Sequence, residues 1–177
     1  GIFDGAYISN IPNVTFFAPN SFESLEQCFD RALNASGPVV IRYPKGNDID
    51  LEFMTKEQQF DYCDFGTNPK NAIITYGRLT ENAIQSAKIC QEKGFNTRVI
   101  SLKTLSPIEI APITEALNGI DNIVFAEEGI KNGGVGQRLC SILAENGKMQ
   151  MIAAGKTAYA RGADSLPGLH HIADLHS

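Results

Sequence analysis

Apolar residues follow two patterns along the chain, and the patterns alternate. In some segments they recur every three or four positions, which is typical of a helix with one apolar face. In others they form short runs rich in β-branched residues, which are typical of buried strands. Strands that alternate with helices of this length favour a mostly parallel sheet with right-handed crossovers and both faces covered.

The second half of the chain carries this alternation most clearly. Strands are expected at residues 72–76, 97–102, 122–126 and 149–154, and helices at residues 80–93, 107–117 and 135–145. Inward positions of the helices include Ala83, Ile84, Ile113 and Leu139. The sequence therefore predicts an α/β fold, with a doubly wound, mostly parallel sheet over residues 70–154.

The first part of the chain predicts a smaller unit of one strand, one helix and one strand. The strands are expected at residues 14–18 and 38–43. Asn20 or Ser21 can cap the helix between them, and Glu23 lies three residues after Asn20, as in a capping box. One crossover cannot close a core, so residues 1–50 are interpreted as a partial α/β unit whose sheet needs further strands.

Two segments have weaker patterns. Residues 51–69 are polar with scattered aromatic side chains, and we interpret them as a linker that becomes a β-arm near Tyr62. Residues 155–177 form a tail of unclear structure. All three histidines lie in its last eight positions, and a loosely packed terminus gives them no supporting groups for a metal site.

Composition narrows the class of protein. The chain has 177 residues, 43% of them hydrophobic and 20% charged, which is typical of a globular protein with room for one good core. A net charge of -5 argues against nucleic-acid binding, and no apolar run approaches the length of a membrane span. We therefore expect a cytoplasmic protein that binds neither nucleic acid nor a membrane. The four cysteines lack zinc-ligand spacing, so we expect free thiols and no metal site.

The segment "IRYPKGN" places two cations directly after a predicted strand. Arg42 and Lys45 lie where open α/β sheets bind ligands, beyond the carboxyl ends of the strands. Together they could hold a phosphate or carboxylate, Arg42 as a fork and Lys45 as a point charge. An equally good interpretation is a surface ion pair with Asp48 or Asp50, and the local pattern leaves both open.

The segment "EEGIKNGGVGQRL" follows another predicted strand. Its glycines precede a helix, so free N–H groups could face a phosphate, but their order differs from a dinucleotide fingerprint. Close packing of the helix against backbone is the favoured interpretation. Glu127 and Glu128 form an adjacent acid pair at the strand end, and we expect them to be exposed rather than catalytic.

A series of segments resembles the 1-deoxy-D-xylulose-5-phosphate synthases, a family of transketolase-like transferases. The segments are "GIFDGAYISNIPNVTFFAPNSFESLEQ", "GPVVIRYPKGN", "ITYGRLTENAIQSA", "VISLKTLSPIE" and "VFAEEGIKNGGVGQRL". Each motif is weak alone, but they occur in the family's order from Gly1 to about Ala154. The resemblance implies that residues 1–50 end a pyrimidine-binding domain and that residues 70–154 form the transketolase C-terminal domain.

The resemblance also implies that this chain is part of a longer protein. The chain begins without Met, and the family's His-Gln pair, which would precede Gly1, is absent. The motifs for thiamine diphosphate and magnesium, and the glutamate that activates the thiamine ring, are absent too. We therefore expect thiamine diphosphate and magnesium in the parent enzyme, but no catalytic, cofactor-binding or metal-binding residue in this chain, which should be inactive alone.

The implied reaction joins pyruvate and glyceraldehyde 3-phosphate to form 1-deoxy-D-xylulose 5-phosphate and carbon dioxide, for isoprenoid biosynthesis, in a homodimer. In the family's Arg-Tyr-Pro-Arg-Gly motif the second arginine holds the substrate phosphate, and Lys45 takes its place here, with Arg42 in a supporting role. Two alternatives remain: the β-subunit of a 2-oxo acid dehydrogenase or another transketolase-like enzyme, and a non-catalytic docking or assembly module.

Overall fold

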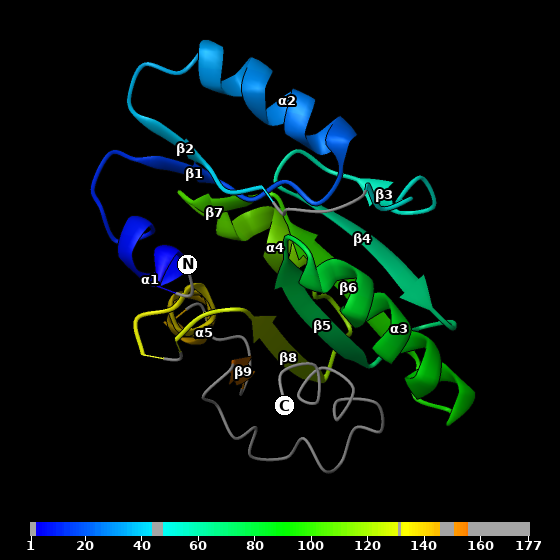
Figure 1. Cartoon of the computed structure of the whole chain (residues 1–177). Helices are drawn as coiled ribbons and strands as arrows, with labels where there is room; N and C mark the ends of the chain where they lie inside the picture. The colour runs from blue at the N-terminus through cyan, green and yellow to red at the C-terminus, as the bar shows by residue number, and fades with distance from the viewer. Residues whose placement is uncertain (1–2, 44–47, 131, 146–150, 156–177) are drawn as a thin grey trace.

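Two sheets form the framework of the chain (Figure 1). The structure is a computed structural model that describes residues 3–43, 48–130, 132–145 and, for the backbone alone, 151–155. In chain order the elements are α1 (Asp4–Ile8), β1 (Thr15–Phe17), α2 (Phe22–Leu33), β2 (Val39–Ile41), β3 (Thr55–Lys56), β4 (Phe60–Phe65), β5 (Asn71–Tyr76), α3 (Leu79–Glu92), β6 (Thr97–Leu102), β7 (Thr104–Ser106), α4 (Ile110–Ala116), β8 (Asn122–Glu127), α5 (Val135–Glu145) and β9 (Met151–Gly155).

The larger sheet has the strand order β3-β4-β6-β5-β8-β9. Strands β6, β5, β8 and β9 are parallel, while β4 runs antiparallel to β6 and β3 antiparallel to β4. The chain moves from β5 to β6 on one side, then crosses to β8 and β9 on the other. The doubly wound α/β fold predicted from the sequence is confirmed.

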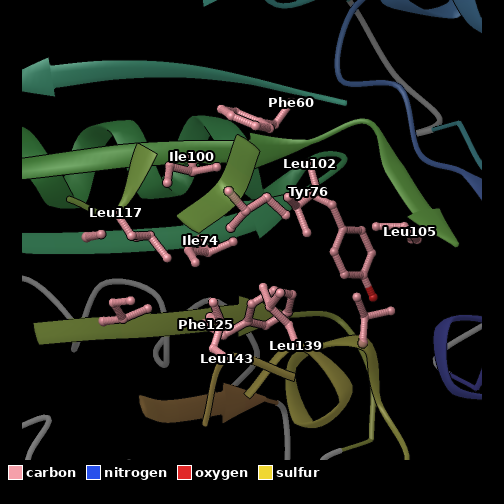
Figure 2. Packing of buried hydrophobic residues seen from close by; sticks show 14 of the residues in the cluster. Phe60, Ile74, Tyr76, Ile100, Leu102, Leu105, Leu117, Phe125, Leu139 and Leu143 are labelled. Carbon is pink, nitrogen blue, oxygen red and sulfur yellow. The ribbon is translucent and has the colours of Figure 1, made fainter. Parts of the chain in front are cut away.

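Alternate residues of β5 supply two different cores, as the two-residue period of a strand requires. Ile74 packs in the large cluster that includes Ile113 of α4 and Leu139 of α5. Figure 2 shows Ile74, Ile100 and Phe125 in this cluster, with Leu139 and Leu143 below them. Ile73 points to the other face, where α3 covers it with Ala83, Ile84 and Ala87. Both faces of the sheet are therefore covered.

The segment expected to be a linker contributes two strands to the larger sheet. Strand β4 pairs with β6 along its whole length, from Phe60 opposite Leu102 to Phe65 opposite Thr97. Phe60 is buried in the large core cluster. A strand near Tyr62 was expected, but the polar residues around Phe60 interrupt the apolar pattern, so the full length of β4 was not predicted.

The smaller sheet joins the two halves of the chain. Strand β1 pairs in parallel with β2 and in antiparallel fashion with β7, which comes directly after β6. A three-residue strand shows no periodic pattern, so β7 was not foreseen, and neither was the five-residue helix α1. Phe16 of β1 is buried in the same cluster as Ile74 and Phe125. The partial N-terminal unit thus shares the core of the C-terminal unit.

Helix α2 begins differently from the expected capping box. Ser21 is the N-cap and Ser24 occupies the N3 position, each hydroxyl accepting from the other residue's backbone N–H. Ser21 as the cap is confirmed, but the box of Asn20 and Glu23 is wrong, because with Ser21 as N-cap the N3 residue is Ser24. The carboxylate of Glu23 lies 3.8 Å from the ammonium of Lys56. The side-chain oxygen Oδ1 of Asn20 accepts a hydrogen bond from the Ser24 hydroxyl, so Asn20 still supports this turn.

Part of the apolar side of α2 is turned away from the rest of the described chain. Phe29 is 51% exposed and Leu33 is 83% exposed, and Phe22 is exposed beside them. Cys28, on the opposite side of the helix, is buried. Figure 1 shows α2 lying outside the small sheet. We call Phe22, Phe29 and Leu33 the outer face of α2.

Candidate functional site

The carboxyl ends of β5 and β8 lie side by side, at the point where the chain's crossovers change direction. Open α/β sheets bind ligands at such a switch point. Tyr76 ends β5 and Glu127 ends β8. The hydroxyl of Tyr76 donates a hydrogen bond to Oε2 of Glu127 over 3.1 Å, so the two strand ends are linked.

Glu127 is a buried hydrogen-bond acceptor at these strand ends. Its side chain is 6% exposed, and its two carboxylate oxygens accept the backbone N–H groups of Val135 and Gly136, each over 3.2 Å. Burial raises the pKa of Glu127, while the hydrogen bonds from Gly136, Tyr76 and Val135 and the charge of Arg42 oppose that rise. The expectation that Glu127 would be exposed is wrong, because these donors compensate its burial.

The glycine-rich segment before α5 packs closely around this carboxylate. A Cβ added at Gly134 would lie 2.4 Å from Oε1 of Glu127, and one added at Gly136 would lie 2.5 Å from Cδ1 of Phe125. Neither position has room for a side chain. The favoured interpretation of close packing is therefore confirmed, and the N–H groups that the sequence offered to a phosphate serve an internal carboxylate instead.

Arg42 approaches the same strand ends from the N-terminal unit. Its backbone N–H donates to the carbonyl of Phe17, which extends the pairing of β2 with β1. Its guanidinium lies 3.9 Å from Oε2 of Glu128, 4.0 Å from Oδ2 of Asp4, and 5.8 Å from the centre of the Tyr76 ring. Two motifs singled out separately in the sequence, around residues 42 and 127, thus meet in space.

The acids around Arg42 differ from those expected. Asp48 accepts the backbone N–H of Phe22 over 2.8 Å, a contact with the start of α2 from 26 residues further along the chain. Asp50 accepts the backbone N–H of Glu52 over 3.1 Å and stabilises a local turn. Glu128 is mostly buried rather than exposed, and it also receives a forked contact from Arg78, whose Nε donates to Oε2 over 2.8 Å.

The guanidinium of Arg42 donates no hydrogen bond to the described residues. Its distances to Asp4 and Glu128 exceed those of N–H···O hydrogen bonds, and no described residue accepts a hydrogen bond from its guanidinium. Lys45 lies outside the described residues. The phosphate site of Arg42 and Lys45 therefore stays a prediction.

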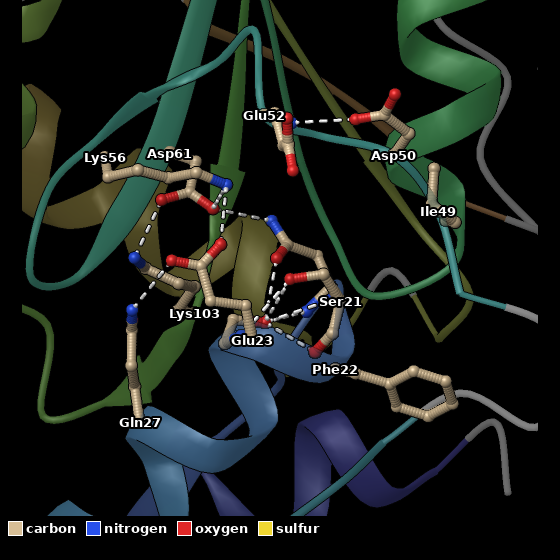
Figure 3. Close-up of polar contacts among 12 residues, drawn as sticks. Ser21, Phe22, Glu23, Gln27, Ile49, Asp50, Glu52, Lys56, Asp61 and Lys103 are labelled. Carbon is tan, nitrogen blue, oxygen red and sulfur yellow. Dashed lines mark hydrogen bonds and ion pairs between the residues drawn. The ribbon is translucent and has the colours of Figure 1, made fainter.

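A second polar cluster lies where the two units meet, and the sequence analysis missed it (Figure 3). Asp61 is fully buried, and its carboxylate lies 2.7 Å from the ammonium of Lys103 and 3.7 Å from that of Lys56. The amide of Asn20 donates to Asp61 over 3.2 Å and to the hydroxyl of Ser101 over 2.9 Å. The sequence feature that could have indicated this cluster is the single acid, Asp61, between the aromatic residues Phe60 and Tyr62.

The four cysteines are free, as expected. Cys28, Cys63 and Cys90 are buried, and Cys140 is partly exposed. Burial raises the pKa of Cys28 to about 11 and that of Cys63 to about 12, so both are thiols rather than thiolates at neutral pH. In the described part of the chain, no three His, Cys, Asp or Glu side chains gather closely enough to hold a metal ion. Within those residues, no helix has the length and apolar character needed to cross a bilayer.

A solved structure with the same arrangement defines the class of fold. It is described as a split gene transketolase, inactive beta4 tetramer, and it matches with a TM-score of 0.72 at 22% identity, over 98% of this chain and 59% of that chain. Such a likeness shows a transketolase fold. Residues 66–166 match the model of the transketolase C-terminal domain, and the chain belongs to that family.

Curated relatives of this chain include 1-deoxy-D-xylulose-5-phosphate synthases, so the resemblance noted in the sequence is confirmed. The protein of that name from Clostridium perfringens (strain 13 / Type A) is 32% identical over 159 residues, which cover 86% of this chain and 25% of the relative. The one from Clostridium beijerinckii is 34% identical over 149 residues, covering 82% and 24%. The chain thus spans about a quarter of the length of these relatives.

Proposed function

We propose that this chain is part of a thiamine diphosphate-dependent transferase that condenses pyruvate with glyceraldehyde 3-phosphate to 1-deoxy-D-xylulose 5-phosphate and carbon dioxide. The observation that carries the proposal is the similarity to synthases of that name across more than four-fifths of the chain. In this proposal the enzyme is a cytoplasmic homodimer. Thiamine diphosphate and magnesium are held by other parts of it, and the cofactor supplies the carbanion chemistry.

In this enzyme, we assign Arg42 and Lys45 to the phosphate of glyceraldehyde 3-phosphate. Arg42 is suited to orient an oxyanion, because Asp4 and Glu128 hold its guanidinium without consuming its hydrogen-bond donors. The forked contact from Arg78 offsets the charge of Glu128, which reduces the repulsion that an incoming phosphate would meet. Lys45 then adds a second positive charge from the segment that follows β2.

The proposal is tested in an enzyme of the relatives' length that contains this chain. Lys45→Ala should raise the KM for glyceraldehyde 3-phosphate by about 10- to 100-fold, since hydrogen bonds to charged groups contribute roughly 1.5–3 kcal/mol. The KM for pyruvate should stay unchanged, and steady-state kinetics measures both.

The matched control is Lys70→Ala, which removes an exposed cation that pairs with Asp121 elsewhere in the chain. An unchanged KM for glyceraldehyde 3-phosphate in Lys45→Ala would show that the phosphate role is wrong. If the unaltered enzyme formed no pentulose phosphate from the two substrates, the proposed reaction itself would fail, and another transketolase-like activity, such as that of a 2-oxo acid dehydrogenase β-subunit, would take its place.

A second candidate function is assembly without catalysis, and the outer face of α2 favours it. Phe22, Phe29 and Leu33 form an apolar stripe that the described chain leaves uncovered, and β2 is an edge strand with one neighbour. In the first proposal, residues 1–50 belong to a pyrimidine-binding domain whose remaining strands and helices cover this face. In the second, the face is an assembly surface of a non-catalytic module, and the product assay separates the two.

A further inference from the structure

A cavity of about 500 Å³ lies at the opposite end of α1 from the Arg42 cluster. Its wall is formed by the connection from α1 to β1, by the end of β7 and by α5. Polar lining residues include Ser9, Asn10, Asn13, Thr15, Ser106 and Arg138. None of the described lining residues is acidic.

Arg138 is the single charged group among these lining residues. One N–H of its guanidinium donates to the carbonyl of Ser9, and no described carboxylate lies within ion-pair distance of it. Burial lowers the pKa of Arg138, as expected for a cation that is partly desolvated without a counter-ion. A guanidinium has five N–H donors in a rigid fork, so most of the donors of Arg138 make no hydrogen bond with the described residues.

Neutral donors face the same space. The hydroxyls of Thr15 and Ser106 make no hydrogen bond with the described residues, although both line the cavity. The amide of Asn10 donates to the carbonyls of Ala6 and Gly133, which fixes its position at the rim. The cavity thus combines one uncompensated positive charge with hydroxyl groups that can rotate to donate.

We propose that this cavity binds a small oxyanion, the carboxylate or phosphate group of a small metabolite, through the fork of Arg138 and the hydroxyls of Thr15 and Ser106. The charge without a counter-ion sets the sign of the ligand, and the planar guanidinium can donate two parallel hydrogen bonds to two oxygens of a carboxylate or phosphate. Because Thr15 belongs to β1, Ser106 to β7 and Arg138 to α5, the bound anion would connect the two units of the chain.

The proposal is tested by ¹H–¹⁵N NMR titration of the full chain with inorganic phosphate and, in a separate arm, with succinate. Sodium chloride keeps the ionic strength constant, because screening alone shifts exposed groups. We expect saturable shifts at the amides of Thr15, Ser106 and Arg138. The arm with the lower dissociation constant identifies a phosphate or a carboxylate as the preferred group.

Three variants accompany the titration. Arg138→Gln should raise the dissociation constant about 10-fold, as expected when charge-assisted hydrogen bonds are lost. Lys88→Gln removes the same charge from an exposed position on α3 and should leave the constant within about 2-fold. Thr15→Val keeps Arg138 in place and should raise the constant about 3-fold, which preserves the test if Arg138→Gln fails to fold.

Two results would overturn the proposal. One is the lack of saturable shifts at the cavity in both arms. The other is a dissociation constant that changes equally in Arg138→Gln and Lys88→Gln, because the effect would then come from net charge rather than from this cavity.

Discussion

The two units of the chain share the same pattern of apolar strands and amphipathic helices, but they differ in how completely these elements are buried. Strand β5 has a neighbour on each side and six buried residues, and α3 presses Ala83, Ile84 and Ala87 against the sheet. Strand β2 has one neighbour and three half-buried residues. Helix α2 turns Phe29 and Leu33 outward. An amphipathic pattern therefore predicts that a helix has an apolar face, but it does not tell what covers that face.

The N-terminal unit contacts the rest of the described chain on one side only. Phe16 joins the large core cluster, β7 pairs with β1, and the buried carboxylate of Asp61 accepts a hydrogen bond from Asn20. These contacts anchor the inner side of the unit, while the outer face of α2 has no such support within the described residues. The contribution of each side to the free energy of unfolding can be measured with single substitutions.

The largest effect is expected from a matched pair of phenylalanines. Phe125→Ala empties a fully buried position beside Gly136 and should lower the free energy of unfolding by about 4 kcal/mol. Phe29→Ala changes the outer face of α2 and should stay within about 0.5 kcal/mol of the unaltered chain. Urea denaturation followed by circular dichroism compares them. Similar losses in both variants would mean that α2 is covered in solution.

The anchor between the units should give the next effect. Lys103→Met leaves the buried carboxylate of Asp61 without its nearest cation and should cost about 3 kcal/mol of unfolding free energy. The double variant Asp61→Asn with Lys103→Met should recover most of that loss. Lys70→Met breaks an exposed pair and should cost less than about 1 kcal/mol. No recovery in the double variant would contradict a charge-based anchor.

The smallest effect concerns the pH dependence of stability. Burial raises the pKa of Glu127 in the folded state, so between its ordinary pKa and the raised one the folded chain binds more protons than the unfolded chain. The stability that this group contributes is full below the ordinary pKa and falls as pH rises through the raised pKa. The unfolding free energy of the unaltered chain relative to Glu127→Gln should therefore decrease with rising pH.

Denaturation at several values between about pH 4 and pH 8 measures that trend. Glu26→Gln removes a carboxylate from an exposed position on α2 and serves as the control. The prediction fails if the two variants have the same pH profile, because the slope would then not come from the buried site.

Much of the fold could be predicted because its strands carry their own signal. Strands β5, β6 and β8 each contain a short run of apolar and β-branched residues, and the helices between them place apolar residues at spacings of three and four. The two boundaries of β6 were predicted without error at Thr97 and Leu102. Strand β4 was harder to see, because Asp61 and Asp64 interrupt its apolar residues, and β7 is too short to carry a period.

The site could be predicted in part. The strand-end rule drew attention to Arg42 and to Glu127 with Glu128, and the structure brings them together. Their partners could not be predicted, because Asp4 and Tyr76 approach Arg42 only through the packing of α1 and the sheet. The same holds for Asp61 and Lys103, whose burial depends on contacts between segments far apart in sequence.

Strand β7 has a consequence for how the chain can be divided. By sequence it follows β6 in the C-terminal unit, yet by pairing it is an edge of the small sheet. A cut near residue 50 would leave β1 without one of its two neighbours and Phe16 without its surroundings. We therefore expect the two segments to unfold together, in a cooperative unit larger than the matched family domain.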